Sequence, residues 1–229
     1  MKFNFSDSTI RLFFLLLVTD ISFMGLHLIY AYTGFTSNHS FSIDLDRGYA
    51  EIFQYIKTYW IAILLVVLAV RLRSILYFIW SALFLYLLVD DFYQIHEEWW
   101  KIISNKLAFE SRFNLRAQDF GELAVSATVG FVFLICIGMA YYFGDRLSRQ
   151  ISKKLIVMLF GLALFGIIVD MLHIAMWNAT LDPIFVILED GGEMVMMSVI
   201  ACFLYFIFDR FSRERVEENL VRAKVLSKK

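Results

Sequence analysis

The sequence predicts an all-α integral membrane protein, a bundle of about six transmembrane helices with both termini in the cytoplasm. Two observations carry this prediction. First, 60% of the 229 residues are hydrophobic and 19% are charged, so a soluble domain of this composition would expose large apolar patches. Second, the apolar residues fall in runs of about 20, the length that crosses a hydrocarbon core. Strand-like alternation is absent, which disfavours a membrane β-barrel.

Each run is predicted to be a helix, because a single segment in lipid must satisfy its own backbone hydrogen bonds. In chain order the predicted spans are Ile10–Tyr32, Ile52–Val70, Ile75–Gln94, Phe120–Phe143, Leu155–Trp177 and Ile184–Phe208. Ser6 precedes the first span and Asp182–Pro183 the last, and these residue types suit an N-cap and a first helical turn. The spans form one predicted domain, 1–208, followed by a polar, helix-favouring cytoplasmic tail, 209–229.

Lysine and arginine residues gather at one set of helix ends, and this orients the bundle. They are Lys2, Arg11, Arg71, Arg73, Arg146, Arg149, Lys153, Lys154, Arg210, Arg213 and Arg215. Because basic loops stay on the cytoplasmic side, these ends and both termini are expected there. The net charge of -1 argues against a nucleic-acid partner. Small size and the lack of a recognisable organelle signal favour the bacterial inner (plasma) membrane as the location.

The opposite helix ends carry acidic residues and histidines, and these share one depth. At about 1.5 Å per residue, Asp90 lies ~25 Å from Arg73, and Glu193 lies ~25 Å from Arg210. The same layer contains Glu122, Asp170, His173 and Glu189. Ionisable residues are costly at membrane depth and therefore mark functional sites by default. We therefore predict a single polar site near the outer leaflet, to which several helices contribute.

Several carboxylates in one layer repel one another unless they hold protons, cations or a metal ion. Asp170 and His173 are spaced as in the Glu-x-x-His motif of carboxylate-bridged di-metal bundles, with Asp in place of Glu. A divalent metal is therefore expected, and mixed oxygen and nitrogen ligands favour Fe, Mn or Zn. Its predicted ligands are His96, Glu97, Glu122, Asp170, His173, Glu189 and Glu193.

Asp90 and Asp91 are the candidate catalytic residues, either of which suits a general acid or base. His96 lies on a different helical face from Asp90, so both reach one centre only if the helix bends between them. The favoured function is a metal-dependent enzyme that opens to the outer leaflet and acts on a lipid or another apolar substrate. The segment Trp99–Leu115 is expected to lie along the interface as a lid over the site.

Three other functions stay open. Carboxylates that share protons also suit a proton- or cation-coupled transporter. Apart from Asp20, however, no polar path is expected across the cytoplasmic half of the bundle. Two of His27, His96 and His173 would allow a haem-binding electron carrier. A non-catalytic membrane assembly partner would use the polar layer as an internal hydrogen-bond network.

Overall fold

The computed structural model describes residues 6–34, 37–104, 115–176 and 180–226, which form helices and short loops without a β-strand. Six helical segments among them are long and apolar enough to cross a membrane, which confirms the predicted all-α membrane bundle. In chain order these spans are Asp7–Thr33 (α1), Tyr49–Leu72 (α2), Ile75–Tyr93 (α3), Ala117–Phe143 (α5), Arg146–Ala175 (α6 to α7) and Asp182–Glu214 (α8 into α9).

The fifth and sixth spans are not regular helices, because each contains a π-helical segment. The fifth span consists of α6 (Arg146–Ala163), the π-helix η2 (Leu164–Val169) and α7 (Asp170–Ala175). The sixth consists of α8 (Asp182–Val186), the π-helix η3 (Ile187–Gly191) and α9 (Gly192–Leu226). The sequence predicted neither interruption. π-Helical turns are rare in proteins, and those that occur are often at functional sites.

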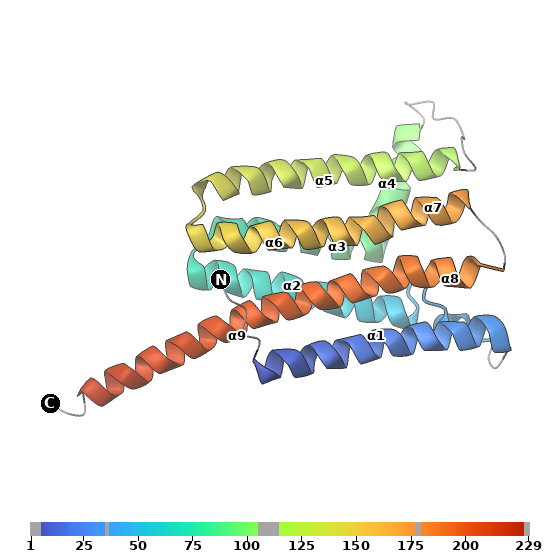
Figure 1. Cartoon of the computed structure of the whole chain (residues 1–229). Coiled ribbons are helices and arrows are strands. Elements are labelled where there is room, and N and C mark those ends of the chain that lie inside the picture. The colour runs from blue at the N-terminus through green and yellow to red at the C-terminus, as the bar shows by residue number, and fades with distance from the viewer. Residues whose placement is uncertain (1–5, 35–36, 105–114, 177–179, 227–229) are drawn as a thin grey trace.

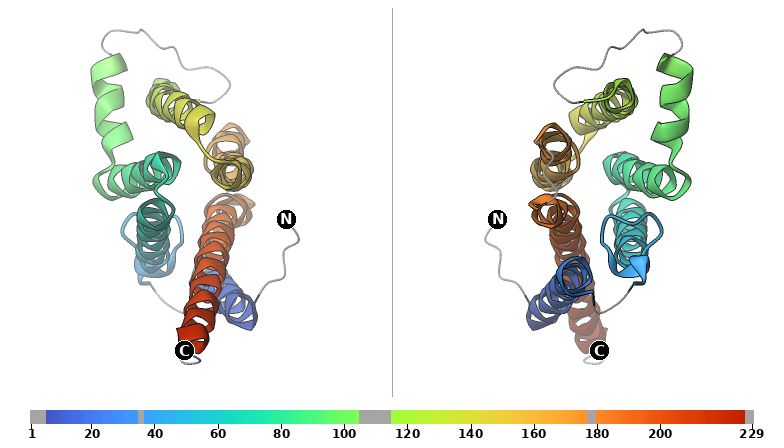
Figure 2. Two further views of the ribbon diagram at one scale, coloured as in Figure 1. Left: turned by 90° about the vertical axis from the view of Figure 1, so that its left-hand side faces the viewer. Right: turned by 90° about the vertical axis from the view of Figure 1, so that its right-hand side faces the viewer.

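The spans lie side by side, and α1 begins at the same end of the bundle at which α9 ends (Figure 1). We call this the basic end, because it carries Arg71, Arg146 and Arg210, and the opposite end the acidic end. At the acidic end, α4 (Ile95–Ser104) lies across the bundle, as Figure 2 shows when the spans are viewed end-on. The predicted lid segment begins in α4, and its residues 105–114 lie outside the described part of the chain.

The apolar core fills the half of the bundle nearer the basic end. Tyr77, Trp80, Leu65 and Leu204 are completely buried there, and they join α2, α3 and α9. Trp80 Nε1 donates a hydrogen bond of 2.9 Å to Ser152 Oγ, which ties α3 to α6. Close side-chain packing and interhelical hydrogen bonds are the forces that hold helices together in lipid. This half therefore provides the rigid base for the polar half above it.

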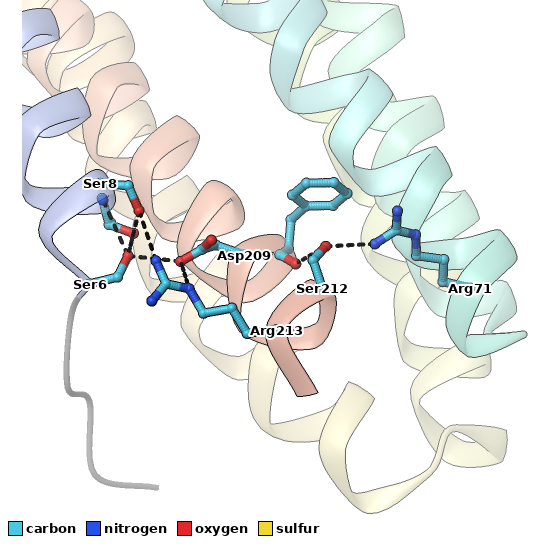
Figure 3. Close-up of polar contacts among 8 residues, drawn as sticks. Ser6, Ser8, Arg71, Asp209, Ser212 and Arg213 are labelled. Atoms are coloured by element: carbon cyan, nitrogen blue, oxygen red, sulfur yellow. Dashed lines mark hydrogen bonds and ion pairs between the residues drawn. The ribbon is translucent and has the colours of Figure 1, made fainter. Parts of the chain in front are cut away.

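Polar contacts at the basic end hold α1 and α2 against α9 (Figure 3). As predicted, the Ser6 side chain caps α1, and it also donates a hydrogen bond of 2.8 Å to Asp209 Oδ2. Arg213 Nε lies 3.1 Å from the same oxygen. Arg71 Nη1 donates a hydrogen bond of 2.8 Å to Ser212 Oγ. Residues at the start of the predicted tail thus contact the bundle directly.

Candidate functional site

A cavity of about 690 Å³ lies between α3, α5, the fifth span and α9, and it extends along α5 from Asp119 near the acidic end as far as Ile137. Six of the predicted site residues line it, namely Asp90, Asp91, His96, Glu122, Asp170 and Glu193. Gln54, Arg116 and Asp119 line it as well. These residues come from α2, α3, α4, α5, the α5 N-cap, α7 and α9. Residues that the sequence places at one depth therefore also face one space.

The remaining walls of the cavity are mostly apolar and reach the outer surface of the bundle. Leu83, Leu87 and Ile137 line the cavity from α3 and α5. Phe131 of α5 and Phe160 of α6 also line it, yet their exposed fractions are 65% and 63%. Because exposed apolar side chains of a spanning helix face lipid, the cavity opens sideways toward the bilayer between these two helices. The site thus joins an acidic chamber to an apolar, lipid-facing space.

Asp90 and His96 form a hydrogen-bonded pair at the junction of α3 and α4. Gln94 has a φ of 53°, and this left-handed residue ends α3 and turns the chain. The turn brings the backbone N–H of His96 to 3.0 Å from Asp90 Oδ1 and its Nδ1 to 3.2 Å from Oδ2. The bend that the sequence required for these residues to meet is therefore present. The hydrogen bond to Asp90 raises the pKa of His96 above its ordinary value, although burial opposes the rise.

Two further carboxylates at the start of α5 have partners of their own. Arg116 is the N-cap of α5, and its Nη2 donates a hydrogen bond of 2.8 Å to Asp119 Oδ1. The backbone N–H of Arg116 donates a second bond, of 2.7 Å, to Oδ2. Glu122 accepts a hydrogen bond of 2.7 Å from Gln118 Nε2, which carries no charge. Asp119 is thus neutralised by a cation, whereas Glu122 is not.

Three further carboxyl groups line the chamber, those of Asp91, Asp170 and Glu193. The charges of Asp91 and Asp170 both act on Glu193, so the three carboxyl groups are electrostatic neighbours. In the described part of the chain, no lysine or arginine lies within ion-pairing distance of any of them. Neighbouring buried carboxylates must share protons or bind a cation. This chamber is therefore suited to cations.

Glycines at the two π-helices allow the fifth and sixth spans to approach closely. A Cβ atom at Gly166 of η2 would lie 1.7 Å from Glu193 Oε1, so the carboxylate occupies the space that a side chain would take. A Cβ atom at Gly192 would lie 2.3 Å from the Phe165 ring. These contacts place the Glu193 carboxylate directly against η2, at the wall of the cavity.

His173 belongs to a separate cluster and does not line the cavity. Its Nδ1 lies 2.9 Å from Glu189 Oε2, and its Nε2 lies 3.0 Å from Asp182 Oδ1. Its ring stacks on Phe185 at a centroid distance of 5.4 Å. Both ring nitrogens therefore have carboxylate partners in this cluster. The prediction that Asp182 caps the last helix is wrong, because Leu181 is the N-cap and the Asp182 side chain turns to His173.

The structure shows no assembled metal centre among its described side chains, because no group of three or more His, Cys, Asp or Glu residues there could hold an ion. The Glu97 side chain lies outside the described residues. Glu189, although outside the cavity, is close enough for its charge to act on Asp170 and Glu193. Any metal bound in the chamber must therefore draw carboxylates from different helices together.

Two buried polar residues in α2 were not among the residues predicted from the sequence. Gln54 lines the cavity and has an exposed fraction of 8%. Its distance along the helix from Arg71, ~26 Å, could have placed it in the acidic layer. Lys57 is completely buried, and its Nζ lies 2.9 Å from Asp20 Oδ1 and 3.3 Å from Ser198 Oγ. A lone lysine within an apolar run was the overlooked signal.

A protein-family model described as "Domain of unknown function (DUF8692)" matches residues 12–207. The match extends from the first span to the sixth and includes every residue that lines the cavity. No curated protein and no solved structure matches the chain.

Proposed function

We propose a function for this chain, which belongs to the DUF8692 family and has six helical segments long and apolar enough to cross a membrane among its described residues. It is a membrane-embedded, metal-dependent enzyme that acts on a lipid or another apolar molecule. The basic end faces the cytoplasm of a bacterium, in its inner membrane, and the cavity opens toward the outer leaflet. The single observation that supports this best is the cavity itself, in which an acidic chamber continues into apolar, lipid-facing walls.

The chemistry of the chamber supports a divalent ion. Glu122, Asp170 and Glu193 offer oxygen ligands, and His96 offers a nitrogen donor. Such a set suits Mn, Fe or Zn, with the ion offsetting the mutual repulsion of the carboxylates. A bound divalent ion polarises a substrate oxygen or activates water. Asp90 orients His96 by two hydrogen bonds, which leaves Asp91 as the general acid or base.

Mass spectrometry of lipids tests the enzymatic part of this proposal. The purified protein, supplied with Mn, Fe or Zn, is incubated with lipids extracted from bacterial membranes, and substrate and product masses are compared before and after. We expect a product that disappears with chelator and with Glu193→Gln. The control is Glu214→Gln, which changes an exposed pair with Arg210 at the basic end and should leave the product unchanged. An unchanged lipid profile under every metal condition would reject the enzyme.

A second candidate, proton- or cation-coupled transport, is favoured by the buried ion pair of Lys57 and Asp20. Lys57 Nζ donates a hydrogen bond of 2.7 Å to the Met194 carbonyl, one residue from Glu193 of the chamber. Ser198 Oγ lies 2.5 Å from Asp20 Oδ2 and extends this polar group. The polar groups thus extend from the chamber to Asp20, the one polar residue that the sequence predicted beyond the acidic layer. Proton flux into liposomes that is abolished by Asp20→Asn would support transport, and sealed vesicles without flux would exclude it.

A further inference from the structure

Gln54 provides an independent indication of what the cavity binds. This residue lines the cavity from α2, and its exposed fraction is 8%. Its Oε1 has no hydrogen-bond partner among the described residues. Buried polar atoms nearly always have a partner, so an orphaned acceptor that lines a cavity indicates a ligand that donates to it.

Acidic residues predominate among the other polar groups of the cavity. Arg116, the one lysine or arginine among the described residues that line it, is already engaged with Asp119, and His96 Nδ1 lies 3.2 Å from Asp90 Oδ2. The remaining carboxylates that line the cavity are Asp91, Glu122, Asp170 and Glu193. Ionised carboxylates and an amide oxygen only accept hydrogen bonds. A complementary ligand must therefore donate hydrogen bonds, and a positive charge on it would be stabilised.

We propose that the cavity selects single-chain amphiphiles whose polar end is a protonated primary amine. The ammonium group donates to Gln54 Oε1 and to the carboxylates, and the chain lies along Leu83, Leu87 and Ile137. The opening beside Phe131 admits the molecule from the bilayer. This inference names the substrate class for the proposed enzyme and rests on that function.

Charge and size both favour this ligand over common anionic lipids. Six Asp or Glu residues and one Arg are among the described residues that line the cavity, so a cationic head group is favoured there over an anionic one. Phosphate and carboxylate head groups would face these acidic residues, and Arg116 on the cavity wall is already paired with Asp119. A volume of about 690 Å³ falls within the range of pockets for drug-sized ligands, which suits one hydrocarbon chain.

Native mass spectrometry of the full chain released from detergent tests the selection. The protein is offered equal concentrations of dodecylamine, dodecanol and dodecanoate, once with the divalent metal and once in chelator. We expect dodecylamine to bind about tenfold more tightly than dodecanoate in both conditions, with dodecanol weaker than the amine. Gln54→Leu should weaken amine binding about tenfold, because the amide acceptor is lost. Gln150→Leu, at an exposed position of α6, is the control and should change nothing.

Equal binding of dodecanoate or dodecanol and the amine by the wild-type protein would overturn the inference, and this comparison needs no variant. Unchanged amine binding by folded Gln54→Leu would overturn it as well. The proposed enzyme can fail separately. A protein that prefers the amine in chelator but produces no lipid product would keep the selectivity and reject the catalytic function.

Discussion

The Glu193 carboxylate packs against Gly166 and occupies the space that a side chain at position 166 would need. We predict that Gly166→Ala displaces the Glu193 carboxylate from the cavity wall, since a Cβ atom would overlap Oε1 at 1.7 Å. Metal affinity should fall about tenfold or more, as when a group that orients a ligand is altered. Because the atom that must move is the flexible end of the Glu193 side chain, the free energy of unfolding should fall by less than the about 1–3 kcal/mol that overpacking of a rigid core costs.

Metal titration and thermal unfolding of Gly166→Ala measure the two effects. The matched control is Gly138→Ala in α5, where an added Cβ meets no atom within 4 Å. That variant should retain metal affinity and gain slightly in helix propensity. A Gly166→Ala protein with the affinity of the wild type would show that the position of Glu193 does not matter for binding.

The buried pair of Lys57 and Asp20 predicts a large effect on stability. Both side chains are completely inaccessible to solvent. Lys57→Met leaves Asp20 with its Ser198 hydrogen bond but without its cation, so stability should fall by about 3–5 kcal/mol. Unfolding of the detergent-solubilised protein by a denaturing detergent measures this loss. The double variant Lys57→Met/Asp20→Leu should recover part of it, and a fully stable Lys57→Met would contradict the account.

The hydrogen bond between His96 and Asp90 should change the titration of the His96 imidazole, which NMR can follow. Its hydrogen bond to Asp90 raises the pKa of His96 above 6.5, the ordinary value. A raised pKa in the folded state means that the pair stabilises the protein fully below pH 6.5 and loses this contribution as the pH rises through the raised value. Asp90→Asn should return the His96 pKa toward 6.5 and weaken this pH dependence. An identical titration in both proteins would contradict the pairing.

Asp145, at the basic end, should contribute stability with the opposite pH dependence. It is the N-cap of α6 and accepts hydrogen bonds from the backbone N–H groups of Leu147 and Ser148. Although partial burial acts to raise it, the pKa of Asp145 is lowered by the nearby Ser148 hydroxyl and these N–H groups. Its stabilisation is complete above pH 3.8 and fades as the pH falls through the lower folded value.

Asp145→Ala should therefore lower the free energy of unfolding by about 1 kcal/mol at neutral pH and by less in acid. Asp145→Ser, which retains an acceptor for the backbone N–H groups, should keep most of the stability. Thermal unfolding at several pH values measures both variants. A loss in Asp145→Ala that is constant with pH would show that the carboxylate charge contributes nothing to the cap.

Much of the fold and part of the site could be predicted from the sequence. Apolar length determines the spans, because a helix in lipid needs no partner to satisfy its backbone. A constant rise per residue determines depth, so Asp90, Asp170 and Glu193 could be assigned to one layer. The sequence also predicted that Asp90 and His96 meet only if the chain bends between them, and the left-handed residue Gln94 provides this bend.

The rest depends on how helices rotate and pack, which depth does not determine. His173 shares the acidic layer, but its side chain turns to Glu189 and Asp182 instead of the cavity. The π-helices arise where glycines allow two spans to touch, as at Gly166. Gln54 was missed because it is uncharged, and its importance lies in an unpartnered atom that only the folded structure reveals.

Elemental analysis of the detergent-purified protein tests most directly whether the chamber binds a metal. We predict near-stoichiometric Fe, Mn or Zn in the wild-type protein and in Glu214→Gln, and its loss in Glu193→Gln, because Glu193 lies at the wall of the acidic chamber. A folded wild-type protein that contains no metal after growth in metal-supplemented medium, or a Glu193→Gln variant with the full metal content, would contradict the account.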